Sequence, residues 1–397
     1  MSAPALFPTP TTIELIYFDA GGGHRSAMKA LSSILATSCP NVSVKATNLQ
    51  TLLKCVDPVF RAAGIPSEQI YNSAVRRGWT RGSKVLLRGL QTGIRMCAPQ
   101  MRSELSRHWR QQRCDMVVSL VPNFNSVMFD ALRDVDVHVP YVSIMTDIAD
   151  SPPSFWQEPQ DQFLICGSEK AYLQALLTGW YRPERVHKTS GMIIHPAFYS
   201  ATSEPLPNLA NLGLDPSLPT ALIMFGGNGS NDALKILDWI EASGIKAQSI
   251  VMCGRNEPLR RALEGHRSCL AVPFTDRVMD YMRLADFYIG KPGPGSISEA
   301  IHCGLPTIVE SNAGTLYQER YNAIWLEERG LGLCLPAFHQ LPEALRYLLS
   351  DDRLTQYQRR ASNLQNRAIF EIPIILNTIL KNSIVSGGCV QAGAASL

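Results

Sequence analysis

The chain has 397 residues, enough for two domains with separate hydrophobic cores. Apolar residues make up 45% of it and charged residues 18%, which is typical of a folded globular protein and excludes a disordered one. The net charge of +3 gives no indication of a nucleic-acid partner. The ten cysteines stand singly, without a Cys-x-x-Cys pair or a Cys/His cluster. We therefore expect a reduced cytosolic protein without a metal site.

Neither a secretory signal nor a membrane-spanning helix is expected. Residues 1–12 contain Pro and Thr but lack a basic segment followed by an apolar core. No apolar run reaches the roughly 18 residues that a spanning helix needs. The sequence predicts a protein that is soluble or lies on a membrane without crossing it.

Short apolar runs alternate with helical ones along the chain, a rhythm that predicts an α/β fold with parallel sheets. We place strands at 13–19, 42–47, 115–120, 140–146, 162–166 and 185–188, then at 220–225, 249–253, 269–271, 286–289, 306–309 and 332–335. The proline-rich segment 196–219 is interpreted as an interdomain linker. The predicted domains are 1–196 and 197–385, followed by a mobile tail over 386–397.

A glycine-rich turn follows the first predicted strand. It reads Asp19-Ala20-Gly21-Gly22-Gly23-His24 and leads into an apolar helix. Glycines let the backbone turn sharply and approach a ligand closely, although the spacing is not the dinucleotide-binding fingerprint. His24, close to the expected start of the helix, is either a base presented beside the loop or a helix-capping histidine.

The stretch 57–102 interrupts the alternation, because it contains no clear strand and its charges are mostly basic. Arginines mixed with Trp, Leu and Ile at helical spacing suit a segment that lies on an anionic membrane. The alternative is an ordinary amphipathic insertion with Trp79 in the core. The candidate membrane and acceptor contacts are Arg76, Arg77, Trp79, Arg81 and Arg88.

The segment 289–308 is the most informative of the chain. A strand ending at Ile289 runs into a Gly- and Pro-rich loop, and a helix is predicted to open at Ser296. Glu299 stands three residues further on, the spacing of a capping box, and Gly304 ends the helix. The free N–H groups at such a helix start can bind a pyrophosphate, while Glu299 can hold vicinal sugar hydroxyls.

The glycine-rich turn at 19–24 and the Gly- and Pro-rich loop at 290–295 each belong to a βαβ series of their own, which indicates two facing Rossmann-like domains. The segments 19–27 and 291–300 together resemble the monogalactosyldiacylglycerol synthase family, and more distantly the N-acetylglucosaminyltransferase that forms lipid II. Further matching segments follow in the same order, at 113–119, 146–147, 166–169, 191–198, 225–229, 253–256 and 318–322. The chain departs from the family pattern at Ala20, His195, Asn228 and Tyr321, which leaves the sugar and the acceptor open.

The resemblance implies a GT-B glycosyltransferase fold and transfer of a hexose, galactose or glucose, from a UDP-sugar to diacylglycerol. The same resemblance implies that the reaction inverts the configuration at the anomeric carbon. It also implies that the protein lies on the inner face of the cytoplasmic membrane. The UDP-sugar is a co-substrate, no cofactor or metal is expected, and the partners are a lipid acceptor and an anionic membrane surface. The alternatives are a polyprenyl-linked or other lipid acceptor, a non-catalytic nucleotide-binding regulator, and a sugar-nucleotide epimerase.

The same resemblance assigns the candidate site residues. His24 is the candidate base, with Asp19 orienting it or acting as base itself, and Asp147 as a third group at the same sheet edge. Gly21, Gly22 and Gly23 form the acceptor loop. The expected donor-binding residues are Gly226, Gly227, Asn228, Arg255, Phe274, Pro294, Gly295, Ser296, Glu299, Gln318 and Glu319, with Asn322 as a weaker candidate. Because ligands bind at the carboxyl ends of parallel strands, we expect both loops to line an interdomain cleft.

Overall fold

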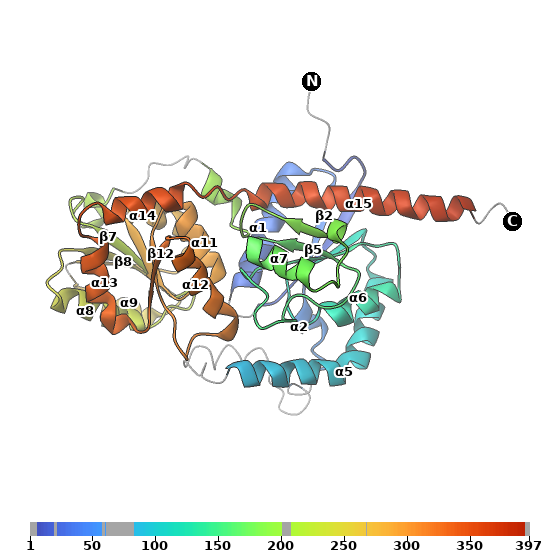
Figure 1. Cartoon of the computed structure of the whole chain (residues 1–397), viewed down its shortest axis with the longest axis horizontal. Coiled ribbons are helices and arrows are strands. Elements are labelled where there is room, and N and C mark those ends of the chain that lie inside the picture. Colours follow the sequence, from blue (N-terminus) through green and yellow to red (C-terminus); the bar gives the residue numbers. More distant parts are fainter. Residues whose placement is uncertain are drawn as a thin grey trace, which may run out of the picture. The chain divides into compact units, whose positions relative to one another are not determined.

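The computed structural model describes residues 6–19, 22–57, 60, 83–200, 208–266 and 268–393. The chain divides into two compact units (Figure 1). The first unit contains the segments before Ala197 and from Arg367 onward, and the second unit contains 197–366. Each is built on a six-stranded sheet in which all strand pairs are parallel, and every predicted strand is present. The predicted α/β class is confirmed.

The sheet of the first unit has the strand order β2-β1-β3-β4-β5-β6. Its strands are β1 (Thr11–Tyr17), β2 (Val42–Asn48), β3 (Met116–Ser119), β4 (Tyr141–Ile144), β5 (Phe163–Cys166) and β6 (Val186–Lys188). Its helices are α1 (Gly23–Ser38), α2 (Leu49–Leu52), α5 (Ser83–Gln111), α6 (Asn125–Arg133), α7 (Glu169–Leu177) and α15 (Ala368–Gly393). The order reverses between β1 and β3, which places the expected ligand-binding crevice beside the carboxyl end of β1.

The long helix α5 packs on this sheet through its C-terminal part. Met101, Leu105 and Trp109 are buried in one core cluster with residues of β1, β3 and α6. Glu14 of β1 is fully buried, and its carboxylate accepts hydrogen bonds from the Trp109 indole (2.8 Å) and the Thr47 hydroxyl (2.6 Å). The helix contains Pro99, which removes one backbone hydrogen bond and bends the helix, as Figure 1 shows.

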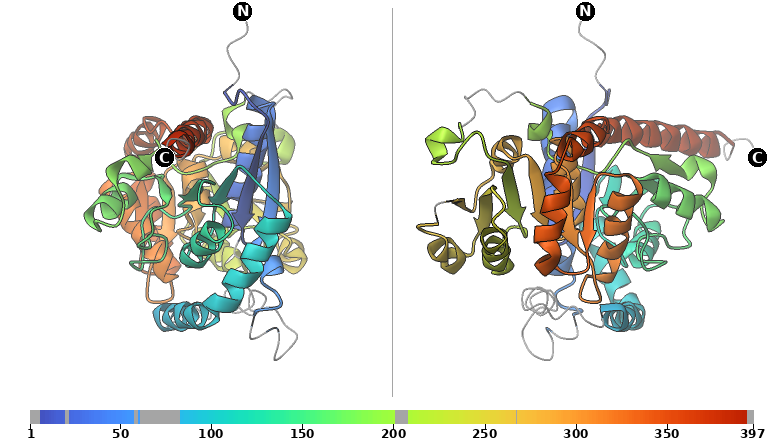
Figure 2. Two further views of the ribbon diagram at one scale, coloured as in Figure 1. Left: turned by 90° about the vertical axis from the view of Figure 1, so that its right-hand side faces the viewer. Right: turned by 60° about the vertical axis from the view of Figure 1, so that its left-hand side comes forward.

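Helix α15 packs with the first unit, whereas the sequence assigns 367–385 to the second domain. Its buried apolar residues, among them Ile372, Leu376 and Ile379, form the face that packs, and the helix runs beside α1 in both views of Figure 2. The helix extends to Gly393. Residues 386–393, predicted as a mobile tail, therefore continue the helix.

The sheet of the second unit has the order β12-β11-β10-β7-β8-β9. Its strands are β7 (Thr220–Met224), β8 (Gln248–Gly254), β9 (Cys269–Pro273), β10 (Phe287–Gly290), β11 (Thr307–Glu310) and β12 (Gly332–Leu335). Its helices are α8 (Asp232–Ala242), α9 (Glu257–Ala262), α10 (Val278–Leu284), α11 (Pro294–His302), α12 (Arg320–Glu328), α13 (Leu341–Leu348) and α14 (Arg353–Ser362). This is the Rossmann order, and the strand order reverses between β7 and β10.

Two hydrophobic clusters hold the second unit together. One joins the strands to α8, α9 and α13, and the other joins β11 to α11, α12 and α14. The sheet is thus covered by helices on both faces, which explains why its strands read as continuous apolar runs. The loops after β7 and β10 meet at the reversal point, where a ligand is expected.

Candidate functional site

His24 lies in the first turn of α1, at the carboxyl edge of the first sheet. Its Nδ1 is 3.1 Å from the hydroxyl of Thr146, which follows β4. The rings of Phe18 and Trp156 lie against the imidazole, with centroids 6.2 and 6.0 Å away. The helix begins at Gly23 and its N-cap residue is Gly22, so His24 is not the cap. His24 thus lies at the carboxyl end of β1, and its contact with a ligand stays a prediction.

Burial lowers the pKa of the His24 imidazole to about 4, and a hydrogen bond to the Leu120 carbonyl offsets only part of this effect. The neutral form therefore prevails at pH 7. A neutral imidazole has one nitrogen that can accept a proton, which is what a general base requires.

The two carboxylates predicted near His24 have structural partners. Asp19 forms an ion pair with Arg25, in the first turn of α1, at 2.7 Å. Asp147 is buried and accepts a hydrogen bond of 2.8 Å from the indole of Trp156, the residue whose ring lies beside His24. Asp147 thus holds the Trp156 ring in place beside His24. Whether Asp19 or His24 is the base stays a prediction.

In the second unit, the loop after β7 is held against the loop after β8 by direct backbone contact. The N–H of Arg255 donates to the Gly227 carbonyl at 3.0 Å. A Cβ on Gly254 would lie 2.4 Å from that same carbonyl oxygen, and Gly254 has φ +57°. Gly227 and Asn228 are exposed on this loop, while Gly226 is half-buried. The sequence pattern of three glycines thus produces an open backbone cradle of the kind that binds phosphates.

Arg255 and Phe274 form one stacked pair beside that cradle. The Arg255 guanidinium carbon lies 4.2 Å from the centroid of the Phe274 ring. The ring of Phe274 also approaches the position of a Cβ on Gly227 within 3.7 Å. The side chain of Phe274 remains 45% exposed, so the planar base of a nucleotide can contact it.

Helix α11 starts two residues earlier than predicted, at Pro294, with Gly293 as N-cap and no side-chain cap bond. The predicted capping box between Ser296 and Glu299 is therefore wrong. Proline is preferred at the first helical position because its φ is already helical, and this preference outweighs the serine signal. The backbone N–H groups of Gly295 and Ser296 have no hydrogen-bond partner within the described ranges, so the helix start can bind an anion. The predicted stop at Gly304 is confirmed, since its φ is +79°.

Glu299 stands one turn into α11 and is half-buried, and its carboxylate accepts no hydrogen bond from any described residue. Burial raises the pKa of this carboxyl to about 7. A partly desolvated carboxylate without a partner gains most from a ligand that brings two hydroxyl donors.

The predicted hexose residues lie beside the β10–α11 loop. Glu319 is buried, and its carboxylate pairs with Lys291 at 3.2 Å, while Gln318 is half-buried. Asn322 is fully buried, and its amide donates to the Pro292 carbonyl at 2.8 Å, which makes it a support of the loop. Lys291 carries no role in the sequence-based assignment. Its place directly after the strand β10, at the start of the Gly- and Pro-rich loop, is the signal that was missed.

Most predicted membrane contacts cannot be placed. Arg76, Arg77, Trp79 and Arg81 lie outside the described residues, as does Gly21 of the predicted acceptor loop. Arg88 is exposed on α5, as are Arg95 and Arg102 at seven-residue intervals along the same helix. In the described part of the chain, no helix is long and apolar enough to cross a bilayer.

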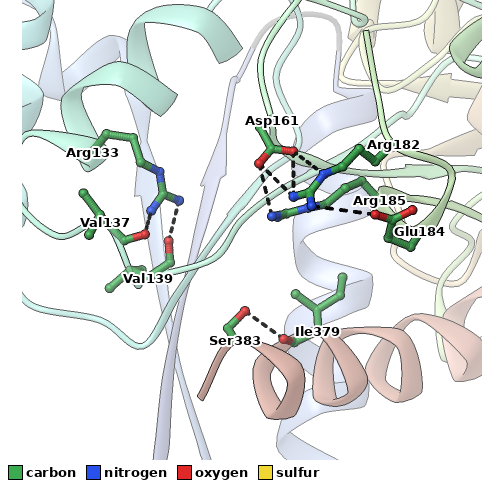
Figure 3. Close-up of polar contacts among 9 residues, drawn as sticks. All are labelled: Arg133, Val137, Val139, Asp161, Arg182, Glu184, Arg185, Ile379 and Ser383. Atoms are coloured by element: carbon green, nitrogen blue, oxygen red, sulfur yellow. Dashed lines mark hydrogen bonds and ion pairs between the residues drawn. The ribbon is translucent and has the colours of Figure 1, made fainter. Parts of the chain in front are cut away.

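A second group of arginines serves the fold. Arg182 and Arg185 both bind Asp161, at 3.0 and 3.2 Å, and Arg133 donates to the carbonyls of Val137 and Val139 (Figure 3). These residues lie at the amino ends of β4, β5 and β6, the edge opposite to His24. Among the described side chains, no group of three His, Cys, Asp or Glu residues is arranged to hold a metal ion.

Residues 222–371 match the glycosyltransferase family 28 C-terminal domain. This range contains every predicted donor-binding residue of the second unit, from Gly226 to Glu319.

Curated relatives confirm the resemblance to monogalactosyldiacylglycerol synthases. The chain is 29% identical over 277 residues to a probable monogalactosyldiacylglycerol synthase 2 of Oryza sativa subsp. indica, which covers 65% of this chain and 57% of the relative. It is 27% identical over 253 residues to the processive diacylglycerol beta-glucosyltransferase of Bacillus subtilis, covering 62% and 63%. The chain thus spans little more than half the length of the rice relative.

The fold is that of GT-B glycosyltransferases. The crystal structure of MurG from Acinetobacter baumannii superposes with a TM-score of 0.57 at 13% identity, over 92% of this chain and 98% of that one. Since the identity is low, this likeness describes the fold alone.

Proposed function

We propose that this chain is a glycosyltransferase that moves a hexose from a UDP-sugar to the hydroxyl of diacylglycerol at a membrane surface. The observation that carries the proposal is the carboxylate of Glu299, which has no hydrogen-bond partner among the described residues, behind the N–H groups of Gly295 and Ser296, which have none there either. A carboxylate suited to vicinal hydroxyls, one turn beyond an anion-binding helix start, matches the ribose and diphosphate of a nucleotide. The relationship to diacylglycerol glycosyltransferases supports the choice of lipid acceptor.

In this proposal the second unit binds the donor. The Gly226–Asn228 loop and the start of α11 hold the diphosphate, Glu299 holds the ribose, and the position of Phe274 seats the base. Gln318 and Glu319 hydrogen-bond the hexose hydroxyls. Developing charge on the leaving diphosphate is stabilised by oriented N–H groups, and no metal ion or cofactor is part of the proposed mechanism.

His24 of the first unit accepts the proton of the acceptor hydroxyl as the new glycosidic bond forms. The bond from the anomeric carbon to the phosphate oxygen breaks in the same displacement, which inverts the configuration. His24 is neutral at pH 7 and so can accept a proton, while its lowered pKa makes it a weaker base than an ordinary histidine. The reaction requires an active complex in which the acceptor at His24 meets the bound donor.

The membrane contact is assigned to α5 and the preceding basic segment, including Arg76, Arg77, Trp79 and Arg81. Arg88 and Arg95 of α5 are exposed and, together with Leu90 at 44% and Met96 at 75% exposure, suit an anionic lipid surface, whereas Arg102 is held by an ion pair with Asp134. A place on the inner face of a cytoplasmic membrane belongs to the same proposal.

The test is incubation of the purified chain with UDP-galactose, UDP-glucose and UDP-N-acetylglucosamine, each with diacylglycerol in anionic vesicles. The expected result is a hexosyl-diacylglycerol and UDP in equal amounts, with UDP release dependent on lipid. Transfer only to a polyprenyl-linked acceptor would change the acceptor class. Tight UDP binding without transfer of any sugar to any acceptor would contradict the proposal and favour a regulator.

A further inference from the structure

The first part of α5, residues 87–98, is held to the first unit by few contacts, and we call it the arm of α5. Of these described residues, Ile94 alone is buried. Pro99 separates the arm from the part of α5 that packs on the sheet, because it removes one helical hydrogen bond. The position of the arm therefore depends on the few side chains of its inner face.

Gln91, on the inner face of the arm, binds two segments that lie far from it in sequence. Its amide Nε2 donates to Oδ1 of Asn123 at 2.9 Å and to the Ser154 carbonyl at 3.4 Å. Asn123 is buried and lies between β3 and α6, whereas Ser154 lies in the β4–β5 loop. The N–H of Asn123 also donates to the Phe155 carbonyl at 2.7 Å. One side chain of α5 thus joins two loops at the carboxyl edge of the first sheet.

Both partners of Gln91 have a strained backbone. Among the described residues, three that are not glycine have a positive φ, and two of them are Asn123 (+66°) and Ser154 (+65°). This conformation is unfavourable for a residue with a side chain and persists only where surrounding contacts impose it. Asp150 supplies part of that support, since its carboxylate accepts hydrogen bonds from the N–H groups of Ser154 and Trp156 at 2.8 and 2.7 Å. Gln91 supplies a further part from α5.

The β4–β5 loop carries the aromatic residue that lies beside His24. The ring of Trp156 is fully buried, and its centroid is 6.0 Å from that of the imidazole. Trp156 and Phe155 belong to a hydrophobic cluster against which Leu87 of the arm packs. The arm thus contacts this loop through an apolar side chain as well as through the amide of Gln91. A displaced arm would release the loop that covers one side of His24.

We propose that Gln91 is a positioning residue, which fixes the β4–β5 loop and, through Trp156, the orientation of the His24 imidazole. The inference rests on the proposed function, in which His24 accepts the proton of the acceptor hydroxyl. Gln91 acts through the loop and not by contact with the reacting atoms. The helix assigned to the membrane surface is then also a support of the acceptor site.

The test compares transfer by the wild-type chain, Gln91→Met and Gln100→Met. Methionine keeps the length of the side chain and removes its donor, and Gln100 is an exposed glutamine of the same helix, which makes it the matched control. The acceptor is a short-chain diacylglycerol below its critical micelle concentration, so that loss of membrane binding cannot explain a change. We expect the kcat of Gln91→Met to fall about tenfold, because a small misplacement of a catalytic group is costly. The KM for the UDP-sugar and the Kd for UDP should not change.

Asn123→Gly shows whether Gln91 acts through Asn123. Glycine adopts a positive φ without strain, so this variant removes the side-chain acceptor and keeps the backbone conformation. Since substitutions of two residues in contact are not additive, the double variant Gln91→Met/Asn123→Gly should lie within about twofold of the slower single variant. Losses of kcat that multiply in the double variant would overturn the proposal.

Hydrogen exchange of residues 150–157, followed by mass spectrometry, tests the support of the loop without any turnover. The amides of Ser154 and Trp156 should exchange faster in Gln91→Met than in Gln100→Met. Equal exchange in the two variants, or a wild-type kcat in Gln91→Met, would overturn the role of Gln91. An equal loss of kcat in Gln100→Met would overturn it as well, because any change in α5 would then suffice.

The failure of this inference can be told from the failure of the proposed function. If the wild-type chain transferred no hexose to any acceptor, the proposed function would fail. Hydrogen exchange would still decide whether Gln91 holds the β4–β5 loop, since that measurement requires neither donor nor acceptor.

Discussion

The hydroxyl of Thr146 lies 3.1 Å from Nδ1 of His24 and thereby joins the end of β4 to the first turn of α1. The indole of Trp156 covers the same imidazole and is itself held by Asp147. These contacts hold the ring in one orientation before any ligand binds, which is the condition for an effective general base.

Replacing His24 by glutamine should lower kcat by about 10²- to 10⁴-fold, the usual contribution of a general base. Binding of UDP should not change, because every proposed donor-binding residue belongs to the second unit. Steady-state transfer assays and UDP titration measure the two effects. His138→Gln, an exposed histidine at the amino edge of the same sheet, is the control and should retain activity. Wild-type turnover in His24→Gln would rule out His24 as base.

Uridine should bind more tightly as the pH rises through about 7. The folded protein holds the pKa of Glu299 near 7, above its ordinary value, so the carboxyl is largely protonated at pH 6. Only the carboxylate accepts hydrogen bonds from both ribose hydroxyls. Uridine is preferred to UDP for this titration because it lacks a phosphate whose own pKa near 6 would interfere. In Glu299→Gln the affinity should be lower and independent of pH. A pH profile that is the same in both proteins would remove Glu299 from the ribose site.

Gly254→Ala should abolish most nucleotide binding. A Cβ there would lie 2.4 Å from the Gly227 carbonyl and force the β7–α8 loop away from the β8–α9 loop. Gly244→Ala is a matched control, since Gly244 also has a positive φ (+70°) but has no atom within 4 Å of the added Cβ. Both variants carry the backbone strain of about 1 kcal/mol or more that a left-handed alanine costs. Equal loss of UDP affinity in the two variants would mean that strain, and not the contact between the loops, is responsible.

The strands and the two glycine turns could be predicted from the sequence because they depend on local signals. Continuous apolar runs such as 220–225 and 306–309 mark strands buried on both faces, and glycines mark the turns. The start of α11 was misplaced because two local signals compete there, Pro294 at a first helical position and Ser296 as a cap. Because these two preferences are similar in size, the sequence alone does not show at which residue the helix begins.

The packing of α15 and the partners of individual site residues depend on contacts distant in sequence. The apolar pattern of 368–380 shows that one face is buried, but it does not show which unit buries it. The pairing of Lys291 with Glu319 spans 28 residues, and the support of Pro292 by Asn322 spans 30. No local pattern encodes such pairs. The sequence analysis therefore gave Glu319 a role in ligand binding and did not predict its ion pair with Lys291.

Substitutions at Glu14 test how strongly its hydrogen bonds to α5 stabilise the first unit. Burial opposes ionisation of this carboxyl, but hydrogen bonds from His108, Thr47 and Trp109 outweigh it and hold the pKa of Glu14 below its ordinary value. Glu14→Leu leaves the buried Trp109 indole without an acceptor, at about 1–3 kcal/mol, and removes the acceptor of the half-buried Thr47 and His108, so it should lower the free energy of unfolding of the first unit by at least that amount. Glu14→Gln keeps an acceptor and should cost less. Glu241→Gln, which removes an exposed carboxylate beside His266, should change stability by less than about 1 kcal/mol.

The same carboxylate predicts an acid-dependent loss of stability. Because the pKa of Glu14 is lower in the folded state, unfolding takes up a proton between the two values, and its contribution is complete only above the unfolded pKa near 4.3. As the pH falls through the folded pKa, the difference in stability between wild type and Glu14→Gln should narrow. Urea unfolding at pH 7, 5 and 3, followed by tryptophan fluorescence, measures this difference. A difference that does not vary with pH would show that the pKa of Glu14 is the same in the folded and the unfolded protein, which would contradict this prediction.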